Sequence, residues 1–260
     1  MLTFALIQRN PCMSNIETKD WFETWFDTPY YHRLYKHRND EEAQQFIDKL
    51  VAFLQPQRED KCLDLACGKG RHAKYLSEKG LNVTGVDLSA NSISQAKKHE
   101  QNNLRFDVHD MREVYKKNTF DYVFNLFTSF GYFDAHQDNL KVLNAIRQSL
   151  VPKGKVVIDF MNVNKSIANL IEEEVKEVDG IPFYIQRKFD GEHIHKFIKF
   201  EDKGKSYEFK ERVQALQKND FEALLKKSNL KLLSIFGDYK LSPFDQTESD
   251  RLIIIAEKNE

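Results

Sequence analysis

Cysteine is scarce in this sequence. Its 260 residues include only three cysteines, Cys12, Cys62 and Cys67. So few, in an odd number, do not make the disulfide framework that stabilises small extracellular domains. They are typical of a protein in a reducing compartment, and we therefore expect a cytoplasmic protein.

Long apolar runs are absent too, and so is an excess of charge of either sign. No stretch approaches the roughly 20 apolar residues that a membrane-spanning helix needs. The 39 lysines and arginines are balanced by 40 acidic residues, which leaves a net charge of −1. Such a chain lacks the basic character of proteins that bind nucleic acids or anionic membranes. We therefore expect no nucleic-acid or membrane partner. We also expect a monomer or a homodimer.

The first residues lack the basic segment and the small-residue cleavage site of a signal peptide. A more typical polar start, Met13-Ser14-Asn15, follows shortly after. We expect that translation begins at Met13, that residues 1–12 are dispensable and that residues 1–19 are disordered or non-native.

Strand and helix patterns alternate through the first half of the chain. Apolar stretches at 61–65, 82–87, 104–109, 122–126 and 155–160 predict five strands, and helical periods separate most of them. A further helical period, preceded by a stretch rich in aromatic residues, covers residues 40–54. Strands that alternate with helices predict a parallel sheet with helices on both faces.

The pattern changes after residue 164. Apolar residues alternate at period two from about 175 to 213, and Asp190-Gly191 and Lys203-Gly204 supply hairpin turns. This predicts an antiparallel insertion. A helix near residue 221 and two strands, 230–239 and 251–257, then predict a hairpin that adds an antiparallel strand to the main sheet.

A glycine turn lies where the first predicted strand meets its helix. Gly68 and Gly70 have no Cβ, so a ligand can approach the backbone there. The helix N-terminus that follows favours a negatively charged group. The spacing Gly68-x-Gly70-x-x-Ala73 also fits the fingerprint of an NAD(P)-dependent oxidoreductase, so this turn alone decides nothing.

Three acids end or adjoin the strands near this turn. Asp87 ends the second strand, where a carboxylate accepts hydrogen bonds from both hydroxyls of a ribose. Asp110 follows the third strand and could accept a bond from an adenine amino group. Asp64 stands where a nicotinamide site usually has an apolar residue, because a carboxylate there would face the pyrophosphate. The sequence therefore favours a phosphate-free, positively charged nucleoside ligand.

These motifs together resemble the class I S-adenosylmethionine-dependent methyltransferases. The stretches that carry the resemblance are Asp64-Leu65-Ala66-Cys67-Gly68-Lys69-Gly70-Arg71-His72, Gly85-Val86-Asp87-Leu88-Ser89, Asp110-Met111, Phe120-Asp121-Tyr122-Val123 and Leu150-Val151-Pro152-Lys153-Gly154-Lys155. The resemblance implies a Rossmann-like αβα sandwich with a seven-stranded sheet, and S-adenosylmethionine as cofactor. It also implies cofactor contacts from Asp64, Ala66, Gly68, Gly70, Asp87, Leu88, Asp110, Met111 and Asn125. Lys69 departs from the small or hydroxylated residue of many members, and its side chain can point to solvent.

The resemblance also implies a division of the chain: a cofactor-binding core with an N-terminal helical cap (20–164), an insertion that acts as a substrate lid (165–213), and a segment that completes the core (214–260). The insertion resembles that of small-molecule members, including relatives of glycine N-methyltransferases, whose N-terminal segment folds over the cofactor. On that analogy Tyr31 and Arg38 are cofactor contacts, with Arg38 pairing with a carboxylate. A packed tyrosine and a surface arginine explain them equally well.

The expected reaction is methyl transfer to a nitrogen or oxygen atom of a small molecule. Phe127, Ser129 and Tyr132 follow the fourth strand at its carboxyl end and are candidates for the acceptor side, although core packing also explains the rings. No residue is recognisable as a catalytic base. A non-catalytic binding module would be expected to have lost a glycine of the turn or the ribose acid, and both are present. A protein or RNA acceptor stays open, although the balanced charge disfavours RNA.

His193 and His195 have a spacing that a metal ion could use. The sequence shows no third ligand, so we expect solvent-facing or lid-lining histidines and no metal site.

Overall fold

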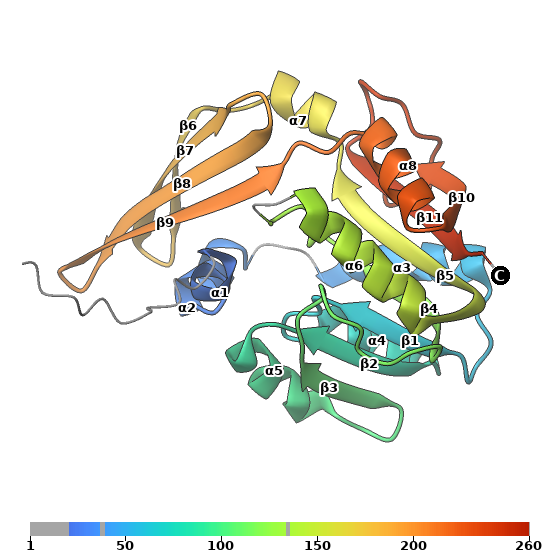
Figure 1. Cartoon of the computed structure of the whole chain (residues 1–260). Helices are drawn as coiled ribbons and strands as arrows, with labels where there is room; N and C mark the ends of the chain where they lie inside the picture. Colours follow the sequence, from blue (N-terminus) through green and yellow to red (C-terminus); the bar gives the residue numbers. More distant parts are fainter. Residues whose placement is uncertain (1–20, 37–39, 134–135, 260) are drawn as a thin grey trace, which may run out of the picture.

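The predicted strands assemble into one seven-stranded sheet in the computed structural model, which describes residues 21–36, 40–133 and 136–259. In chain order the strands are β1 (Lys61–Leu65), β2 (Asn82–Asp87), β3 (Leu104–Val108), β4 (Phe120–Asn125), β5 (Leu150–Met161), β10 (Leu230–Phe236) and β11 (Arg251–Lys258). Their order across the sheet is β10-β11-β5-β4-β1-β2-β3 (Figure 1). Neighbours among β1–β5 pair in parallel, whereas β11 runs antiparallel to β5 and β10. The predicted mostly parallel sheet with a reversed last strand is confirmed.

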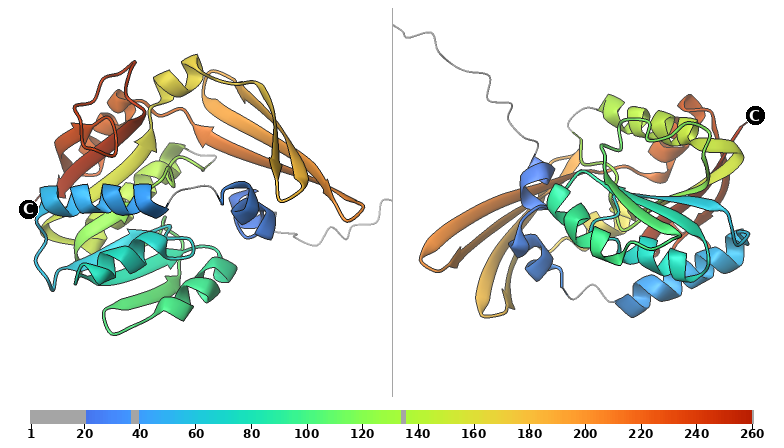
Figure 2. Two further views of the ribbon diagram at one scale, coloured as in Figure 1. Left: turned by 180° about the vertical axis from the view of Figure 1, so that it is seen from behind. Right: turned by 90° about the horizontal axis from the view of Figure 1, so that it is seen from below.

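Helices cover both faces of this sheet (Figure 2). One face packs against α3 (Asp40–Leu54), α4 (Arg71–Glu78) and α5 (Ala90–Ala96), which continues into the short 3₁₀ helix η1 (Lys97–His99). The other face packs against α6 (His136–Ser149) and α8 (Lys218–Lys227). The side chains of a strand alternate between faces, so Cys62 of β1 contributes to the first cluster and Leu63 to the second. The αβα sandwich is therefore confirmed.

A separate four-stranded antiparallel sheet follows α7 (Val163–Ala168). It consists of β6 (Glu173–Val178), β7 (Ile181–Phe189), β8 (His193–Asp202) and β9 (Lys205–Gln214). This is the predicted antiparallel insertion, and its strands begin and end within two residues of the expected bounds.

Two short N-terminal helices, α1 (Trp21–Trp25) and α2 (Pro29–Leu34), lie against this second sheet (Figure 1). Trp25 is fully buried there, and its indole N–H donates to Glu211 of β9 over 2.7 Å. The aromatic N-terminal stretch is thereby placed between the insertion and the main sheet.

Strand β5 begins at Leu150, five residues before the predicted start at 155, and so includes Pro152-Lys153-Gly154. Lys153 has a φ of 62°, and the pairing register with β4 shifts between Leu150 and Lys155. The chain therefore bends within a strand that remains paired at both ends.

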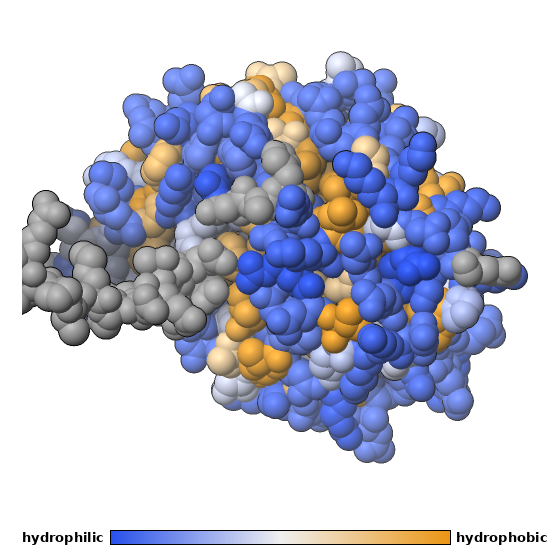
Figure 3. All heavy atoms as spheres, in the orientation of Figure 1, coloured by the Kyte–Doolittle hydropathy of each residue, from blue (hydrophilic) through white to orange (hydrophobic). Residues whose placement is uncertain are grey.

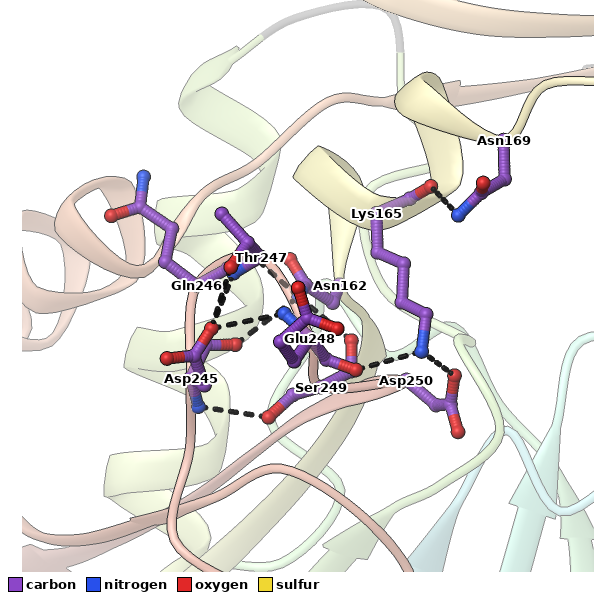
Figure 4. A network of polar contacts seen from close by, with 9 residues as sticks. All are labelled: Asn162, Lys165, Asn169, Asp245, Gln246, Thr247, Glu248, Ser249 and Asp250. Carbon is purple, nitrogen blue, oxygen red and sulfur yellow. Dashed lines mark hydrogen bonds and ion pairs between the residues drawn. The ribbon is translucent and has the colours of Figure 1, made fainter.

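Asn162 fastens the loop between β10 and β11 to the start of α7 (Figure 4). Its buried amide N–H₂ donates to the carbonyl oxygens of Gln246 (3.0 Å) and Ser249 (2.8 Å). Lys165, one turn later, pairs with Asp250 over 2.7 Å. These contacts hold the base of the insertion against the main sheet.

Hydrophilic side chains dominate the face of the molecule in Figure 3, and hydrophobic ones form small separate patches on it. Within the ranges that the structure describes, no helix combines the length and apolar character required to cross a membrane.

Candidate functional site

A cavity of about 390 Å³ opens at the carboxyl ends of the parallel strands. Open α/β sheets bind their ligands at this edge. The cavity is lined by residues that end or directly follow β1, β2, β3 and β4, and α1 and α2 close it from the other side. Ten predicted site residues line it: Tyr31, Ala66, Gly68, Asp87, Leu88, Asp110, Met111, Phe127, Ser129 and Tyr132.

The two glycines of the turn after β1 have different surroundings. A Cβ added at Gly68, whose φ is +56°, would have no atom within 4 Å, so the backbone there is open to a ligand. A Cβ at Gly70, whose φ is +81°, would lie 2.5 Å from the Phe106 ring. Gly70 is the N-cap of α4 and does not line the cavity. It allows the helix to pack on the sheet, and Gly68 leaves space for the ligand.

Asp87 is held at the cavity edge by two backbone amides. Its carboxylate accepts hydrogen bonds from the N–H groups of Gly68 and Ser89, each over 2.8 Å. Burial raises the pKa of Asp87, although these two hydrogen bonds act in the opposite direction. Each carboxylate oxygen keeps a second lone pair, which is what two ribose hydroxyls require.

Asp110 lines the cavity as one half of an ion pair. The Arg112 guanidinium donates to both of its oxygens, over 2.6 to 3.1 Å. Burial acts to raise the pKa of Asp110, but the hydrogen bonds and charge of Arg112 outweigh it and hold the pKa below its ordinary value. Asp110 is therefore an ionised acceptor beside the cavity at neutral pH.

Known proteins share this sequence pattern and this fold. Residues 62–154 match the model of a methyltransferase domain family. YqeM of Bacillus subtilis (strain 168), named as a methyltransferase, is 28% identical over 209 residues, which cover 76% of this chain and 84% of YqeM. The solved S-adenosylmethionine-dependent methyltransferase of Clostridium acetobutylicum ATCC 824 is 19% identical, with a TM-score of 0.75 over 89% of this chain and 96% of its own. The chain therefore carries a methyltransferase domain over residues 62–154 and has the fold of the class I S-adenosylmethionine-dependent methyltransferases.

A second solved structure shares the fold at greater distance. It is an amino pentose methyltransferase from Micromonospora echinaspora with bound S-adenosylmethionine, 16% identical with a TM-score of 0.67 over 89% of this chain and 97% of that one. The match to a methyltransferase domain decides against the NAD(P)-dependent oxidoreductase, the alternative that the glycine turn had left open. The solved structure from Micromonospora echinaspora holds the methyl donor S-adenosylmethionine. The open backbone at Gly68 and the carboxylate of Asp87 beside it fit the adenosine part of that donor.

Two predicted contacts of this methyltransferase lie beneath the turn and do not line the cavity. Asp64 is 1% exposed, and burial raises its pKa to about 7 although the Ala73 amide donates to it. Asn125 is fully buried and donates from Nδ2 to the carbonyl oxygen of Leu65 over 3.0 Å. Both side chains face into the sandwich, so they lie under the glycine turn and not in the cavity. Arg38 lies outside the described residues.

The loop after β4 places an aromatic ring in the methyltransferase cavity. Phe127 and Thr128 have φ values of 57° and 59°, a left-handed conformation that side chains disfavour. Asp159 holds this conformation, because its Oδ2 accepts the Phe127 N–H and its carbonyl oxygen accepts the Thr128 N–H. The Phe127 ring then stacks on His72, with the centroids 4.8 Å apart.

The opposite wall of the cavity is aromatic. Tyr132 makes an edge contact with Trp21, with ring centroids 5.4 Å apart, and a contact with Phe26 at 5.3 Å. Tyr31 packs against Phe26 at 4.8 Å and belongs to the same wall. Elements 100 residues apart in the sequence therefore enclose one space.

Several cavity residues were not predicted from the sequence, and five of them are basic: His32, Lys69, Arg71, His72 and His109. Lys69 lines the cavity, and partial burial lowers the pKa of its ammonium group. The position of Lys69 between Gly68 and Gly70 could have identified it as a cavity residue, because such a turn lies beside the ligand. His32 had no signal in the sequence. Burial and the charge of Lys69 lower its pKa to about 4, so His32 is neutral at pH 7.

Proposed function

We propose that this protein transfers the methyl group of S-adenosylmethionine to a nitrogen or oxygen atom of a small-molecule acceptor. The proposal depends on one observation. Asp87 and Gly68 line one side of the cavity, and the ring of Phe127 and the aromatic wall line the other. A donor that lies against the strand ends would then present its methyl group to a partly enclosed space. A small acceptor fits a cavity of about 390 Å³.

On the donor side we assign three roles. Asp87 binds the ribose hydroxyls, Asp110 accepts a bond from the adenine amino group, and Gly68 lets the donor approach the backbone. Leu88 and Met111 line the cavity beside these acids and contribute apolar contact with the base. Ala66 begins the turn with a φ of 62° and helps to aim the following amides at the ligand.

The donor carries its methyl group on a sulfonium, which already activates it for displacement. The residues of this chain therefore have to orient the acceptor and exclude water. Phe127, Ser129 and Tyr132 are placed to do so on the acceptor side. Tyr31 lines the cavity from α2, and we assign it a contact with the donor.

The methyltransferase from Micromonospora echinaspora, which has the same fold, is named for an amino pentose, a sugar that bears a nitrogen atom. That likeness supports a small polar acceptor for this chain. His32 is neutral at pH 7 and so adds no positive charge to the cavity.

The test is methyl transfer from S-adenosylmethionine labelled in its methyl group. Purified protein is incubated with an extract that contains metabolites, RNA and proteins, and the label is then separated by ultrafiltration. Chromatography of the filtrate then separates new labelled compounds from the unreacted donor. We expect a new labelled compound in the low-molecular-weight fraction, and about tenfold less of it with Asp87→Ala when the donor is subsaturating. Asp121→Ala is the control, since Asp121 lies at the amino end of β4, away from the cavity, where it accepts the Lys61 N–H. Label confined to RNA or protein would overturn the small-molecule assignment.

A further inference from the structure

The end of the β7–β8 hairpin gathers four potential metal ligands within six residues, Asp190, Glu192, His193 and His195. Asp190 closes the turn, because its Oδ1 accepts the N–H groups of Glu192 (3.0 Å) and His193 (2.7 Å). Its Oδ2 is left facing the side of β8 that carries both imidazoles, 2.5 Å from Nε2 of His195. The third ligand that the sequence did not show is therefore present in the turn.

Both histidines are buried, 9% and 7% exposed, which excludes the solvent-facing of the two alternatives expected for them. Each keeps a buried ring nitrogen that has no hydrogen-bond partner among the described residues, Nε2 of His193 and Nδ1 of His195. A buried polar atom without a hydrogen-bond partner destabilises the fold. A ligand bound at this hairpin end would supply the missing partner of Nε2 of His193.

We propose that this hairpin end binds a divalent transition-metal ion of the zinc type. One ligand atom each from Asp190, His193 and His195 lie within 4.8 Å of one another. Ligands around a tetrahedral zinc ion lie about 3.3 Å apart, given metal–ligand distances near 2.0–2.1 Å. Small side-chain rotations bring the three atoms to that spacing. The ion would bind Nε2 of His195 and Oδ2 of Asp190 in place of the hydrogen bond between them, with His195 bound as the tautomer that carries its proton on Nδ1.

Glu192 lies beside His193. Its Oε2 lies 3.9 Å from Nδ1 of His193, on the opposite side of the ring from the unpartnered Nε2. This separation is too long for a hydrogen bond, but metal-bound histidines commonly have a carboxylate near their other ring nitrogen. The arrangement leaves Nε2 of His193 as the atom directed at the ion.

The charges around the cluster are compatible with a cation. Lys188 and Arg212 stand opposite His195 on the neighbouring strands and share its face of the sheet. The Lys188 ammonium, however, lies over the Phe197 ring, 5.5 Å from its centroid and farther from the turn. Asp190 and Glu192 place two negative charges at the turn itself, which match the two charges of the ion.

The position of the cluster assigns a structural role to the ion. The carbonyl of Glu192 accepts the Ala215 N–H, and the Gln214 N–H donates to the carbonyl of Gly131, each over 2.8 Å. The hairpin end is thus joined to the loop that leads to the cavity wall at Tyr132 and Phe133. A bound ion fixes the insertion sheet at the point where it meets that loop.

Zinc binding by tag-free protein tests the proposal. The protein is treated with a chelator, dialysed and titrated with zinc chloride by calorimetry, and the same is done with two variants and a control. Asp190→Asn keeps an oxygen that can accept the two turn amides, and His193→Ala removes one imidazole. His99→Ala removes an exposed histidine on η1. We expect one zinc ion per chain for wild type and His99→Ala, and at least tenfold weaker binding for Asp190→Asn and His193→Ala.

Absence of stoichiometric zinc binding by the wild type would overturn the proposal, and so would unchanged binding by Asp190→Asn. Circular dichroism checks that each variant is folded, and Asp190→Asn decides the question if His193→Ala is not. No residue of the three-ligand cluster lines the methyltransferase cavity. Binding of S-adenosylmethionine is therefore expected to be equal in all four proteins, and a negative zinc result leaves the proposed function untouched.

Discussion

Asp159 and Arg251 form a buried ion pair, with 2.7 Å between Oδ1 and Nε. Asp159 is fully buried at the end of β5, and the same carboxylate accepts the N–H of Phe127. The Arg251 guanidinium also donates to the hydroxyl of Thr128 over 2.9 Å. One ion pair thus supports the left-handed turn that brings a ring into the cavity.

Replacing the arginine tests how much of the fold depends on this pair. Arg251→Met leaves the Asp159 charge buried without its partner, a change that costs about 3–5 kcal/mol. We expect that loss in the free energy of unfolding, measured by urea denaturation. Lys199→Met is the matched control, because the Lys199–Glu208 pair is exposed and worth about 0–1 kcal/mol. A loss in Arg251→Met no larger than in the control would contradict the role of the pair.

The two glycines of the turn are expected to respond differently to alanine. Gly70→Ala forces a Cβ to within 2.5 Å of the Phe106 ring, and overpacking of this kind costs roughly 1–3 kcal/mol. Gly68→Ala has open space, so its methyl group points toward the ligand and its main effect is weaker binding of S-adenosylmethionine. Both carry the strain of a positive φ, which cancels when the two are compared. Denaturation and calorimetry on both variants check the prediction, and equal stability losses would refute it.

Asp64 predicts a pH dependence of stability. Its pKa is about 7 in the folded protein against an ordinary value of 3.8, so the folded state retains a proton that the unfolded state has lost. Rising pH therefore destabilises the fold across this window, by up to about 1.4 kcal/mol per pH unit. Asp64→Asn cannot lose a proton, so its stability relative to the wild type is expected to rise between about pH 4 and pH 7. If the free energies of unfolding of the two proteins differed by the same amount at every pH, Asp64 would be ionised in the folded protein and the prediction would be wrong.

Asn162 is expected to hold the last hairpin loop in place. Asn162→Ala removes the amide N–H₂ that satisfies the carbonyls of Gln246 and Ser249 (Figure 4), and leaving such groups unpaired costs about 1–3 kcal/mol. Asn169→Ala removes an exposed contact with the carbonyl of Lys165 and should cost far less. Thermal denaturation of both variants measures the difference, and limited proteolysis shows whether residues 238–250 become accessible. Equal melting temperatures would mean that the loop is held by other contacts.

The strands and the glycine turn could be predicted from the sequence because each is encoded locally. The bounds of β1 and β2 agree with the prediction, and the acids at the strand ends follow from them. The direction of a side chain at the end of a strand is harder to predict. Asp64 and Asp87 occupy similar places in their strands, yet one faces the interior and the other the cavity.

The rest of the site depends on contacts between distant segments. His32 belongs to the cavity only because α2 packs against the four-stranded sheet, which no local pattern specifies. The cluster around His193 was missed for a related reason: the hairpin turn folds Asp190 back onto β8, and sequence spacing alone does not show it.

The central claim, that Asp87 binds the sugar of S-adenosylmethionine, is tested most directly by calorimetric titration of the purified protein with that compound. Hydrogen bonds to a charged group contribute about 1.5–3 kcal/mol, so Asp87→Ala is expected to raise the dissociation constant about tenfold or more. Asp121→Ala, at the far end of the sheet, is expected to bind as the wild type does. An unchanged dissociation constant for Asp87→Ala would contradict the account.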